Sequence, residues 1–428
     1  MRPTVTEQTE QAAAAEPPAA ATQPNGPGMT QPRPRSLPTS ARIELAAVVG
    51  VAPYLRTTIG TKKGWRHTAF APVTAPLAQE WKLHNGYLKP NHFGDPVQEY
   101  WAMRRGAGLW DVTGEEVIEI AGPEALAVMN ELVPRDLSRL ADGMSLYCIM
   151  CYDHGGIVED GILVRFSAER LWWVGGPAPA EEWIYANAHD RNVTVRSFHE
   201  EIHVASLQGP RSRALLDGLA AADLAALPFF GMVETEVCGV PVVITRTGYT
   251  AELGYDIYVE VPRGAGLFAA LWAALEPEGV ALCGSRALDL RRTEAAILNI
   301  GQEFDMRVSP LEIGLDRLIN WKKGEFRGRA ALARQREEGV SRRLVGLRLD
   351  GDLVAVPGEA VVAGGRAVGE ITTGNWSPAL EASLAIAMVP AETAAPGTRL
   401  AVDLAGTEAP ATVVPMPFLD PERRLSKV

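Results

Sequence analysis

The chain has 428 residues, of which 47% are hydrophobic, so it can bury the large cores of two or three globular domains. Its 41 lysines and arginines are outnumbered by 52 aspartates and glutamates, and the formal net charge of -11 argues against nucleic acid or an anionic membrane as a partner. Four cysteines are too few for a disulfide framework in so long a chain, and we expect a cytoplasmic protein.

The N-terminal part, residues 1–42, consists mainly of Ala, Pro, Thr and Gln and holds almost no large apolar side chains. Such a composition cannot bury enough apolar surface to offset the entropy of ordering, so we predict a disordered tail. The apolar stretch 45–51 that follows is too short to span a bilayer.

The next elements alternate between helix and strand. Residues 99–113 predict a helix that ends at Gly106 or Gly108 and leads into a strand, and residues 122–133 predict a helix that starts at a Gly-Pro pair. The segments "MSLYCIM" and "ILVRF" have the β-branched and aromatic content of buried strands.

Two adjacent acids, Glu159 and Asp160, stand between those strand segments, just after the turn "DHGG". A carboxylate that enters an apolar core needs a hydrogen-bond or charge partner, because desolvating it alone is costly. The two acids therefore predict a partner that the local sequence does not supply.

Two short patterns resemble metal or redox sites. "HEEIH", from His199 to His203, matches the helical zinc pattern, but the following "IHVASLQG" favours a strand, in which the two imidazoles lie roughly 13 Å apart. Cys148 and Cys151 have a C-x-x-C spacing inside an apolar strand, which favours buried free thiols. We expect no metal site.

The second half of the chain predicts a hairpin, a helix and then a separate β module. "VVITRTGYT" and "GYDIYVEV" alternate as paired strands, and "GLFAALWAALEPEG" is an amphipathic helix closed by Gly279. From residue 341 to 428 the short alternating segments punctuated by Gly and Pro predict a β-barrel or Greek-key domain, and residues 43–338 form the remaining α+β region.

Polar residues gather in two places that could be either a ligand site or a solvated face with ordinary ion pairs. Tyr249, Glu252 and Asp256 follow the predicted hairpin. A helical stretch holds the others: Asp289, Arg291, Arg292 and Glu294.

Taken together, these segments resemble the tetrahydrofolate-dependent one-carbon transferase family, whose best-known member is the glycine-cleavage aminomethyltransferase. The similarity runs from about residue 99 to the C-terminus. It implies an α+β fold of three domains arranged like a cloverleaf around a folate channel, with two interleaved domains in residues 43–338 and tetrahydrofolate as the cofactor. The segments that carry it include "GLWDVT", "LYCIMCYDHGGIVEDGILV", "LQGPRSRALL", "TRTGYTAELGYDI" and "GEITTGNWSPALEASLAIAMV".

The resemblance also implies roles for individual residues. It places Tyr147, Tyr249 and Asp256 on or around the pterin and Glu159 beside the reactive folate nitrogens. Glu252 and Trp376 are further candidates for the folate site, and Tyr147, Tyr152 and His154 are candidate proton donors. Leu288 stands where the family has an arginine, so binding of the folate tail is expected to fall to Arg286, Arg291 or Arg292.

"EYWAMRR", "LRRTE" and "SPLEIG" resemble the demethylases of the family more than its glycine-cleavage member. We therefore expect a demethylase that moves a methyl group from a small methoxyaromatic or sulfonium compound to tetrahydrofolate, without a lipoyl-protein partner. The alternatives are methylene transfer from a methylenedioxy-aromatic, the aminomethyltransferase reaction of glycine cleavage, and a non-catalytic folate-binding protein of iron–sulfur assembly. The last is disfavoured because "ILNIGQE" lacks the Lys-Gly-Cys-Tyr run of that group.

Overall fold

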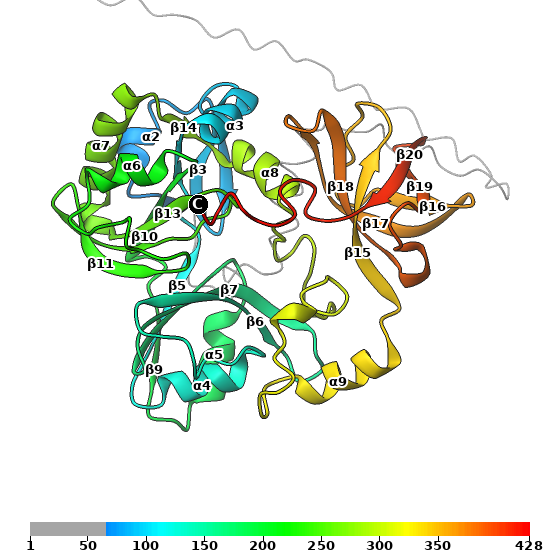
Figure 1. Ribbon diagram of the computed structural model, residues 1–428, viewed down its shortest axis with the longest axis horizontal. Helices are drawn as coiled ribbons and strands as arrows, with labels where there is room; N and C mark the ends of the chain where they lie inside the picture. The colour runs from blue at the N-terminus through cyan, green and yellow to red at the C-terminus, as the bar shows by residue number, and fades with distance from the viewer. Residues whose placement is uncertain (1–65) are drawn as a thin grey trace, which may run out of the picture. The chain divides into compact units, whose positions relative to one another are not determined.

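The computed structural model describes residues 66–428, which form three β-sheets and a closed β-barrel together with helices (Figure 1). The predicted tail and the apolar stretch 45–51 lie outside the described residues. None of the helices from residue 66 onward combines the length and the apolar character needed to cross a bilayer. The predicted α+β class with a C-terminal β-barrel is confirmed.

The largest open sheet has six strands and is built from two separated parts of the chain. Its order is β11 (Met232–Val237), β12 (Val240–Thr245), β13 (Gly254–Glu260), β10 (Ile202–Gln208), β4 (Gly108–Asp111) and β14 (Ala281–Cys283). Helices α3 (Pro96–Arg105), α6 (Ser212–Asp217), α7 (Val261–Leu275) and α8 (Ser285–Glu294) accompany it, with the 3-10 turn η3 (Glu276–Glu278) after α7. The predicted hairpin of β12 and β13 is confirmed.

Between β4 and β10 the chain forms a five-stranded sheet. Its order is β6 (Met144–Cys151), β7 (Ile157–Ser167), β8 (Arg170–Gly175), β5 (Glu116–Ala121) and β9 (Thr194–Ser197). Helices α4 (Ala125–Leu132) and α5 (Ala180–Ala188) pack on one face, where buried residues of the helices and of strands β5 to β8 form one core. The opposite face of β6 and β7 is not covered by these helices and is turned toward the rest of the protein.

A small sheet precedes these two, and a barrel follows them. The small sheet pairs β3 (Tyr87–His92) with β1 (Arg66–His67) and β2 (Glu80–His84), and α2 (Ala71–Thr74) lies in the chain between β1 and β2. The turn η4 (Asp316–Leu318) and helix α9 (Arg329–Glu338) lead to the barrel of β15 (Arg342–Leu349), β18 (Ala382–Pro390), β17 (Arg366–Ser377), β16 (Ala360–Ala363), β19 (Arg399–Leu404) and β20 (Thr407–Val414), with η5 (Ala391–Thr393) after β18.

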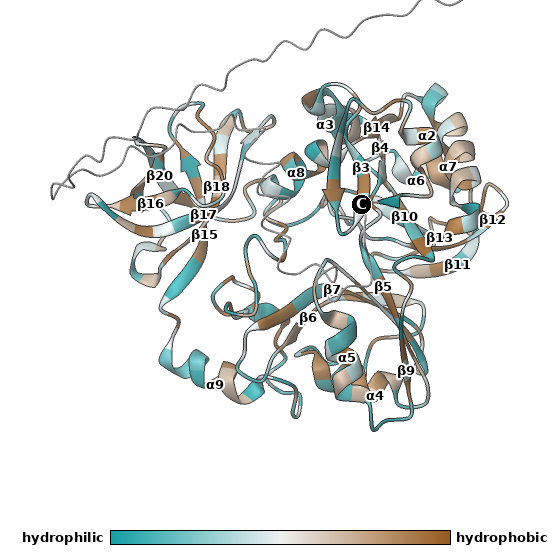
Figure 2. Ribbon diagram, turned by 180° about the vertical axis from the view of Figure 1, so that it is seen from behind, coloured by the Kyte–Doolittle hydropathy of each residue, from teal (hydrophilic) through white to brown (hydrophobic). Residues whose placement is uncertain are grey.

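Local chemistry explains where several elements begin and end. Asp95 caps α3 by accepting a hydrogen bond from the Val97 backbone N–H, Pro96 occupies the first helical position, and the helix ends at Gly106 as predicted. Gly279 adopts a left-handed φ of 78° after α7 and η3, which a residue without a Cβ tolerates best. Figure 2 shows largely hydrophobic colouring along β6 and much hydrophilic colouring on α9, consistent with a buried strand and an exposed helix.

Candidate functional site

A cavity of about 790 Å³ lies where several elements meet. Strands β6, β7 and β8 of the five-stranded sheet and strand β13 of the six-stranded sheet line it. Further lining residues come from the loop before β13, helix α8, residues 296–300 and 313–318, the barrel strands β15 and β20, and the segment 416–427. This volume lies in the range that holds a drug-sized ligand.

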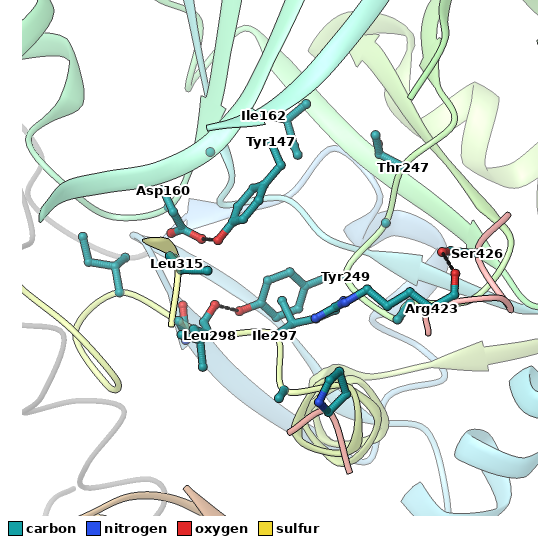
Figure 3. A pocket seen from close by; sticks show the side chains of 18 of the residues that line it. Tyr147, Asp160, Ile162, Thr247, Tyr249, Ile297, Leu298, Leu315, Arg423 and Ser426 are labelled. Atoms are coloured by element: carbon teal, nitrogen blue, oxygen red, sulfur yellow. Dashed lines mark hydrogen bonds between the residues drawn. The ribbon is translucent and has the colours of Figure 1, made fainter. Parts of the chain in front are cut away.

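Tyr147 and Asp160 form a hydrogen-bonded pair on the cavity side of β6 and β7. Tyr147 lies opposite Ile162 in the antiparallel register, so Asp160 is its diagonal neighbour on the same face. The Tyr147 hydroxyl donates to Asp160 Oδ2 at 2.7 Å (Figure 3). Burial raises the pKa of Asp160 to about 6, against the lowering effect of that hydrogen bond. Burial and the nearby Asp160 raise the pKa of Tyr147 well above its usual value, so Tyr147 stays a donor.

Tyr249 enters the cavity from the loop between β12 and β13. Its hydroxyl donates to the carbonyl oxygen of Leu298 at 2.8 Å, which fixes the ring (Figure 3). Tyr147 and Tyr249 thus present two anchored aromatic rings from different elements to the same cavity. Such rings suit a planar heterocycle, which they contact through their faces or edges.

Two further carboxylates line the cavity near each other. Asp256 accepts hydrogen bonds from Ser206 Oγ at 2.6 Å and from Thr247 Oγ1 at 2.7 Å. Burial raises its pKa. Burial and the like charge of Asp256 raise the pKa of Glu115 to about 8. The cavity therefore offers acceptors for ligand N–H groups, since such donors relieve the desolvation of a carboxylate.

A cationic part of the cavity holds Arg317 and Arg423. Arg423 lies in the C-terminal segment, and its side chain reaches toward Ile297 and Tyr249 in Figure 3. Its Nη2 donates to the Ala295 carbonyl oxygen at 3.2 Å, and Arg317 Nη1 donates to the Gly314 carbonyl oxygen at 3.0 Å. Neither arginine makes an ion pair with another residue between 66 and 428. Burial and the charge of Arg317 lower the pKa of Arg423, which is the expected effect on a buried cation that has a cationic neighbour and no anionic partner among the described residues.

Comparison with known proteins assigns most of the described region. Residues 67–323 match the family profile described as GCVT N-terminal domain, and residues 342–420 match the glycine cleavage T-protein C-terminal barrel domain. The chain belongs to the glycine cleavage T-protein family. It is a tetrahydrofolate-dependent one-carbon transferase, as the resemblance implied.

Curated relatives cover most of the chain. A protein of Symbiobacterium thermophilum named aminomethyltransferase is 38% identical over 79% of this chain and 93% of its own length. Aminomethyltransferases of Moorella thermoacetica and Streptomyces coelicolor are 37% and 35% identical, over 78% and 82% of this chain and 92% and 97% of their own lengths. The crystal structure of glycine cleavage system aminomethyltransferase T from Bartonella henselae has the same fold, with a TM-score of 0.78, 23% identity, and coverage of 84% of this chain and 99% of that chain.

These comparisons overturn the predicted activity. The expectation of a demethylase acting on a methoxyaromatic or sulfonium compound is wrong, because relatives that are 33% to 38% identical over most of the chain carry the name aminomethyltransferase. The short motif "EYWAMRR" lies in helix α3. It belongs to the fold and does not identify the one-carbon donor.

Glu159 does not line the cavity, although it was expected beside the folate nitrogens. It pairs with Met150 in the β6–β7 register and therefore points to the face that α4 and α5 cover. Its side chain is 1% exposed, and Oε2 accepts a hydrogen bond from Trp173 Nε1 at 2.7 Å. A Cβ built on Gly175 would lie 2.5 Å from the Glu159 carboxyl carbon, so the carboxylate is packed beneath that glycine.

The structure separates the other predicted site residues into two groups. Tyr147, Tyr249, Glu252 and Asp256 line the cavity. His154 is exposed on the turn before β7, where its Nε2 lies 2.7 Å from the Met306 carbonyl oxygen. Trp376 in β17 does not line the cavity.

The predicted arginine is also engaged elsewhere. Arg292 is 2% exposed and lies outside the cavity lining, where it pairs with Asp289 at 3.3 Å and Glu303 at 3.4 Å and donates to Thr373 Oγ1 at 3.1 Å. Arg291 is fully buried and pairs with Glu252 at 3.0 Å. Neither guanidinium is free to hold the folate tail, and Arg286 is absent from the cavity lining.

Glu252 lines the cavity but has two cationic partners, Arg104 and Arg291. The two ion pairs join α3 to α8 through Glu252, so its carboxylate already has charge partners within the protein. This is one of the ordinary ion pairs that the sequence left open as an alternative.

The candidate metal and thiol patterns have structural explanations. His199 and His203 are both buried beside Tyr87, and His203 Nδ1 accepts a hydrogen bond from the Ala69 backbone N–H at 2.8 Å. Cys148 and Cys151 are buried free thiols, as predicted, and burial raises both pKa values to about 12. Among residues 66–428 no three His, Cys, Asp or Glu side chains are grouped so that they could hold a metal ion.

Sequence reasoning missed Asp160, Glu115, Arg317 and Arg423 as cavity residues. The alternation of a strand separates Glu159 from Asp160 but does not say which one faces the ligand. Glu115 stands in a Gly-Glu-Glu loop that has no distinctive pattern, and the two arginines come from distant segments. No short-range signal would have found the last three.

Proposed function

We propose that the chain is an aminomethyltransferase that transfers the one-carbon unit of an aminomethyl group to tetrahydrofolate. The observation that carries the proposal is the Tyr147–Asp160 pair, which faces a cavity of suitable volume in a chain similar to aminomethyltransferases over most of its length. Tetrahydrofolate supplies the nucleophilic ring nitrogen that accepts the carbon.

The residues that line the cavity fit a reduced folate. The rings of Tyr147 and Tyr249 suit the flat pterin, and the carboxylate of Asp256 and the carboxyl oxygen of Glu115 suit its N–H donors. The guanidinium of Arg423 suits a carboxylate of the tail. We assign Asp160 to the position beside the reactive nitrogens for which the sequence had indicated Glu159. The family resemblance requires an acid there, and Asp160 is the member of the pair that lines the cavity.

Asp160 would accept the proton that the attacking folate amine loses as the new carbon–nitrogen bond forms and the bond from the transferred carbon to the departing ammonia breaks. A base works best when its pKa lies near the operating pH, and a value of about 6 leaves Asp160 ionised at neutral pH while still basic enough to take a proton briefly. Tyr147 orients the carboxylate through its hydroxyl. Holding donor and acceptor together in the cavity contributes roughly 7 to 11 kcal/mol relative to a bimolecular encounter.

The experiment that tests this function offers the aminomethyl group to the purified protein in two forms, on a lipoyl-protein and as a small amine, each with tetrahydrofolate. Formation of a one-carbon folate and release of ammonia are measured. The expectation that no lipoyl-protein takes part belonged to the demethylase interpretation, so this comparison tests it directly. Absence of a folate product with both donors would rule the function out.

We also propose a cytoplasmic location. All four cysteines of the chain are free thiols, and a reducing compartment keeps thiols in that state. Fractionation of the producing cells, followed by immunodetection of the native protein, tests this assignment.

A further inference from the structure

Three lysines line the cavity, and the proposed folate contacts use none of them. They are Lys82 in β2, Lys89 in β3 and Lys427 in the C-terminal segment. An amine is a nucleophile only when it is neutral, and an ordinary lysine with a pKa of about 10.4 is almost entirely protonated at neutral pH. The surroundings of each lysine therefore decide whether it can react.

Lys82 and Lys427 both stay cationic. Lys82 Nζ lies 3.3 Å from Asp289 Oδ2. Against the raising effect of burial, Lys82 and Arg292 lower the pKa of Asp289 to about 2, so this carboxylate is ionised and keeps Lys82 charged. Lys427 is exposed, where water favours the ammonium form.

Lys89 has a different environment. Its side chain is 6% exposed, and its Nζ donates one hydrogen bond within the described chain, to the Thr113 carbonyl oxygen at 2.9 Å. It makes no ion pair with any residue from 66 to 428. Burial lowers its pKa to about 8 against the charge of Asp111, and the charge of Lys82 adds to the lowering. Roughly one tenth of the molecules therefore carry a neutral amine here at pH 7.

The register of the small sheet explains the influence of Lys82. Lys82 and Lys89 lie directly opposite each other in the antiparallel β2–β3 pair, so their side chains leave the same face of the sheet. A neighbouring cation disfavours a second positive charge, and this device activates lysine nucleophiles. Because Asp289 keeps Lys82 charged, Lys89 is the member of the pair that gives up its proton.

Lys323 shows that a lowered pKa alone does not make a reactive site. Burial lowers its pKa to about 8 as well. Its Nζ donates to the carbonyl oxygens of Asn130, Val133 and Arg135, which occupy all three N–H donors of an ammonium. Lys323 is also absent from the cavity lining, whereas Lys89 combines the lowered pKa with access to the cavity.

The proposed reaction indicates which electrophile such an amine would meet. The carbon of an aminomethyl group has the oxidation state of formaldehyde, and attack of water on it releases formaldehyde and ammonia. Formaldehyde reacts with neutral amines and has only two heavy atoms, so it can enter a cavity of about 790 Å³ beside a larger ligand.

We propose that Lys89 is a covalent acceptor for formaldehyde, which it holds as a Schiff base inside the cavity. The inference rests on the proposed function, because tetrahydrofolate in the same cavity gives the captured carbon a route into the folate product. Lys89 thereby retains one-carbon units that water has released from the donor.

The chemistry balances without an oxidant or a reductant. The neutral Nζ attacks the formaldehyde carbon, the C=O electron pair moves to oxygen, and a proton passes from nitrogen to oxygen. Loss of one water then forms the C=N bond. In the return step two folate amine nitrogens bond to this carbon, the C–N bond to Lys89 breaks, and the two protons that the folate loses restore the lysine amine.

Reductive trapping on the full-length wild-type protein tests the proposal. The protein is incubated without folate at pH 7 with dilute formaldehyde and sodium cyanoborohydride, which reduces a lysine Schiff base to a methylated lysine. Mass-spectrometric peptide mapping follows each site over time. Lys89 should be methylated at least tenfold faster than the exposed Lys322 and than Lys323. Methylation of Lys89 at the same rate as these two, or more slowly, would overturn the inference.

Lys82→Met tests how Lys89 is activated. Loss of the opposing cation should raise the pKa of Lys89, so the pH profile of its methylation should move upward and its rate at pH 7 should fall about tenfold. Lys322→Met removes a lysine from the exposed surface and should leave the Lys89 profile unaltered. An unchanged profile in Lys82→Met contradicts the proposed activation.

Thermal melting checks that both variants fold, and the mapping of the wild-type protein decides the proposal if Lys82→Met does not. The aminomethyl-transfer assay is run separately. Preferential methylation of Lys89 without aminomethyl transfer removes the proposed function and keeps the covalent site, whereas transfer without preferential methylation does the reverse.

Discussion

The phenol oxygen of Tyr147 lies 2.7 Å from Oδ2 of Asp160, and the hydrogen bond joins the two strands that form one wall of the cavity. The bond holds the carboxylate in one orientation, and Tyr147 remains protonated because its pKa is raised well above the usual value. The pair therefore combines a fixed base with a permanent donor.

Asp160→Asn should lower turnover strongly and leave the fold intact. The substitution keeps the size and one acceptor oxygen but removes the charge, and one charge-assisted hydrogen bond is worth about 1.5 to 3 kcal/mol, or roughly tenfold to hundredfold in rate. Single-turnover formation of the folate product measures the effect. Wild-type turnover in this variant would remove Asp160 from the mechanism.

Glu159→Gln is the matched control on the neighbouring residue. Because Glu159 is packed beneath Gly175 and hydrogen-bonded to Trp173, its substitution should change the melting temperature more than the rate per folded molecule. Loss of turnover without loss of stability would return the catalytic assignment to Glu159.

The rate should depend on pH through Asp160. Its pKa is raised to about 6, so kcat/KM should rise as pH increases toward 6 and level off above it, where the carboxylate is ionised. For stability the sign is opposite. The group favours the folded state below its unfolded pKa, and this contribution is lost as pH rises through about 6. Comparison of pH profiles for the wild type and Asp160→Asn isolates both effects, and an unchanged acidic limb in the variant would assign it to another group.

Arg423→Gln should weaken folate binding through the tail. The guanidinium lines the cavity without an ion-pair partner among residues 66–428, so a ligand carboxylate is its proposed partner. Affinity for tetrahydrofolate should fall about tenfold to hundredfold, whereas affinity for 6-methyltetrahydropterin, which has no tail, should not change.

Arg424→Gln is the control for that measurement. Arg424 is exposed and pairs with Glu422, so its loss should alter neither affinity. Equal losses for tetrahydrofolate and for the pterin fragment in Arg423→Gln would show that Arg423 contacts the ring or supports the fold instead of the tail.

Arg292→Met should destabilise the protein by about 3 to 5 kcal/mol, because it leaves the buried Glu303 without its cationic partner. The double variant Arg292→Met with Glu303→Gln should recover part of that loss, since the uncompensated charge is then removed. Denaturant unfolding followed by fluorescence provides the measurement. A stable single variant with impaired folate affinity would instead favour the cofactor role predicted from the sequence.

Much of the fold follows from the sequence alone. The alternation in "VVITRTGYT" and "GYDIYVEV" predicts paired strands, and the glycine after "LEPE" ends the turn η3 that follows α7, because period and turn chemistry are local properties of the chain. The segments shared with known one-carbon transferases identified the family and its folate for a similar reason. Their order along the chain is a property of the sequence, so no distance between residues is needed to recognise it.

The tertiary structure decided which residues face the ligand. Alternation places Glu159 and Asp160 on opposite faces of β7, but only the packing of α4 and α5 on one face assigns Glu159 to the core and Asp160 to the cavity. In the same way, the sequence pointed to Arg292 as an anion ligand, whereas the structure places Arg423 in the cavity lining. Their difference arises because Arg292 meets Glu303 and Thr373 from remote segments, whereas Arg423 meets no carboxylate within ion-pair distance in the described chain, and such long-range partners are fixed by chain packing and not by local pattern.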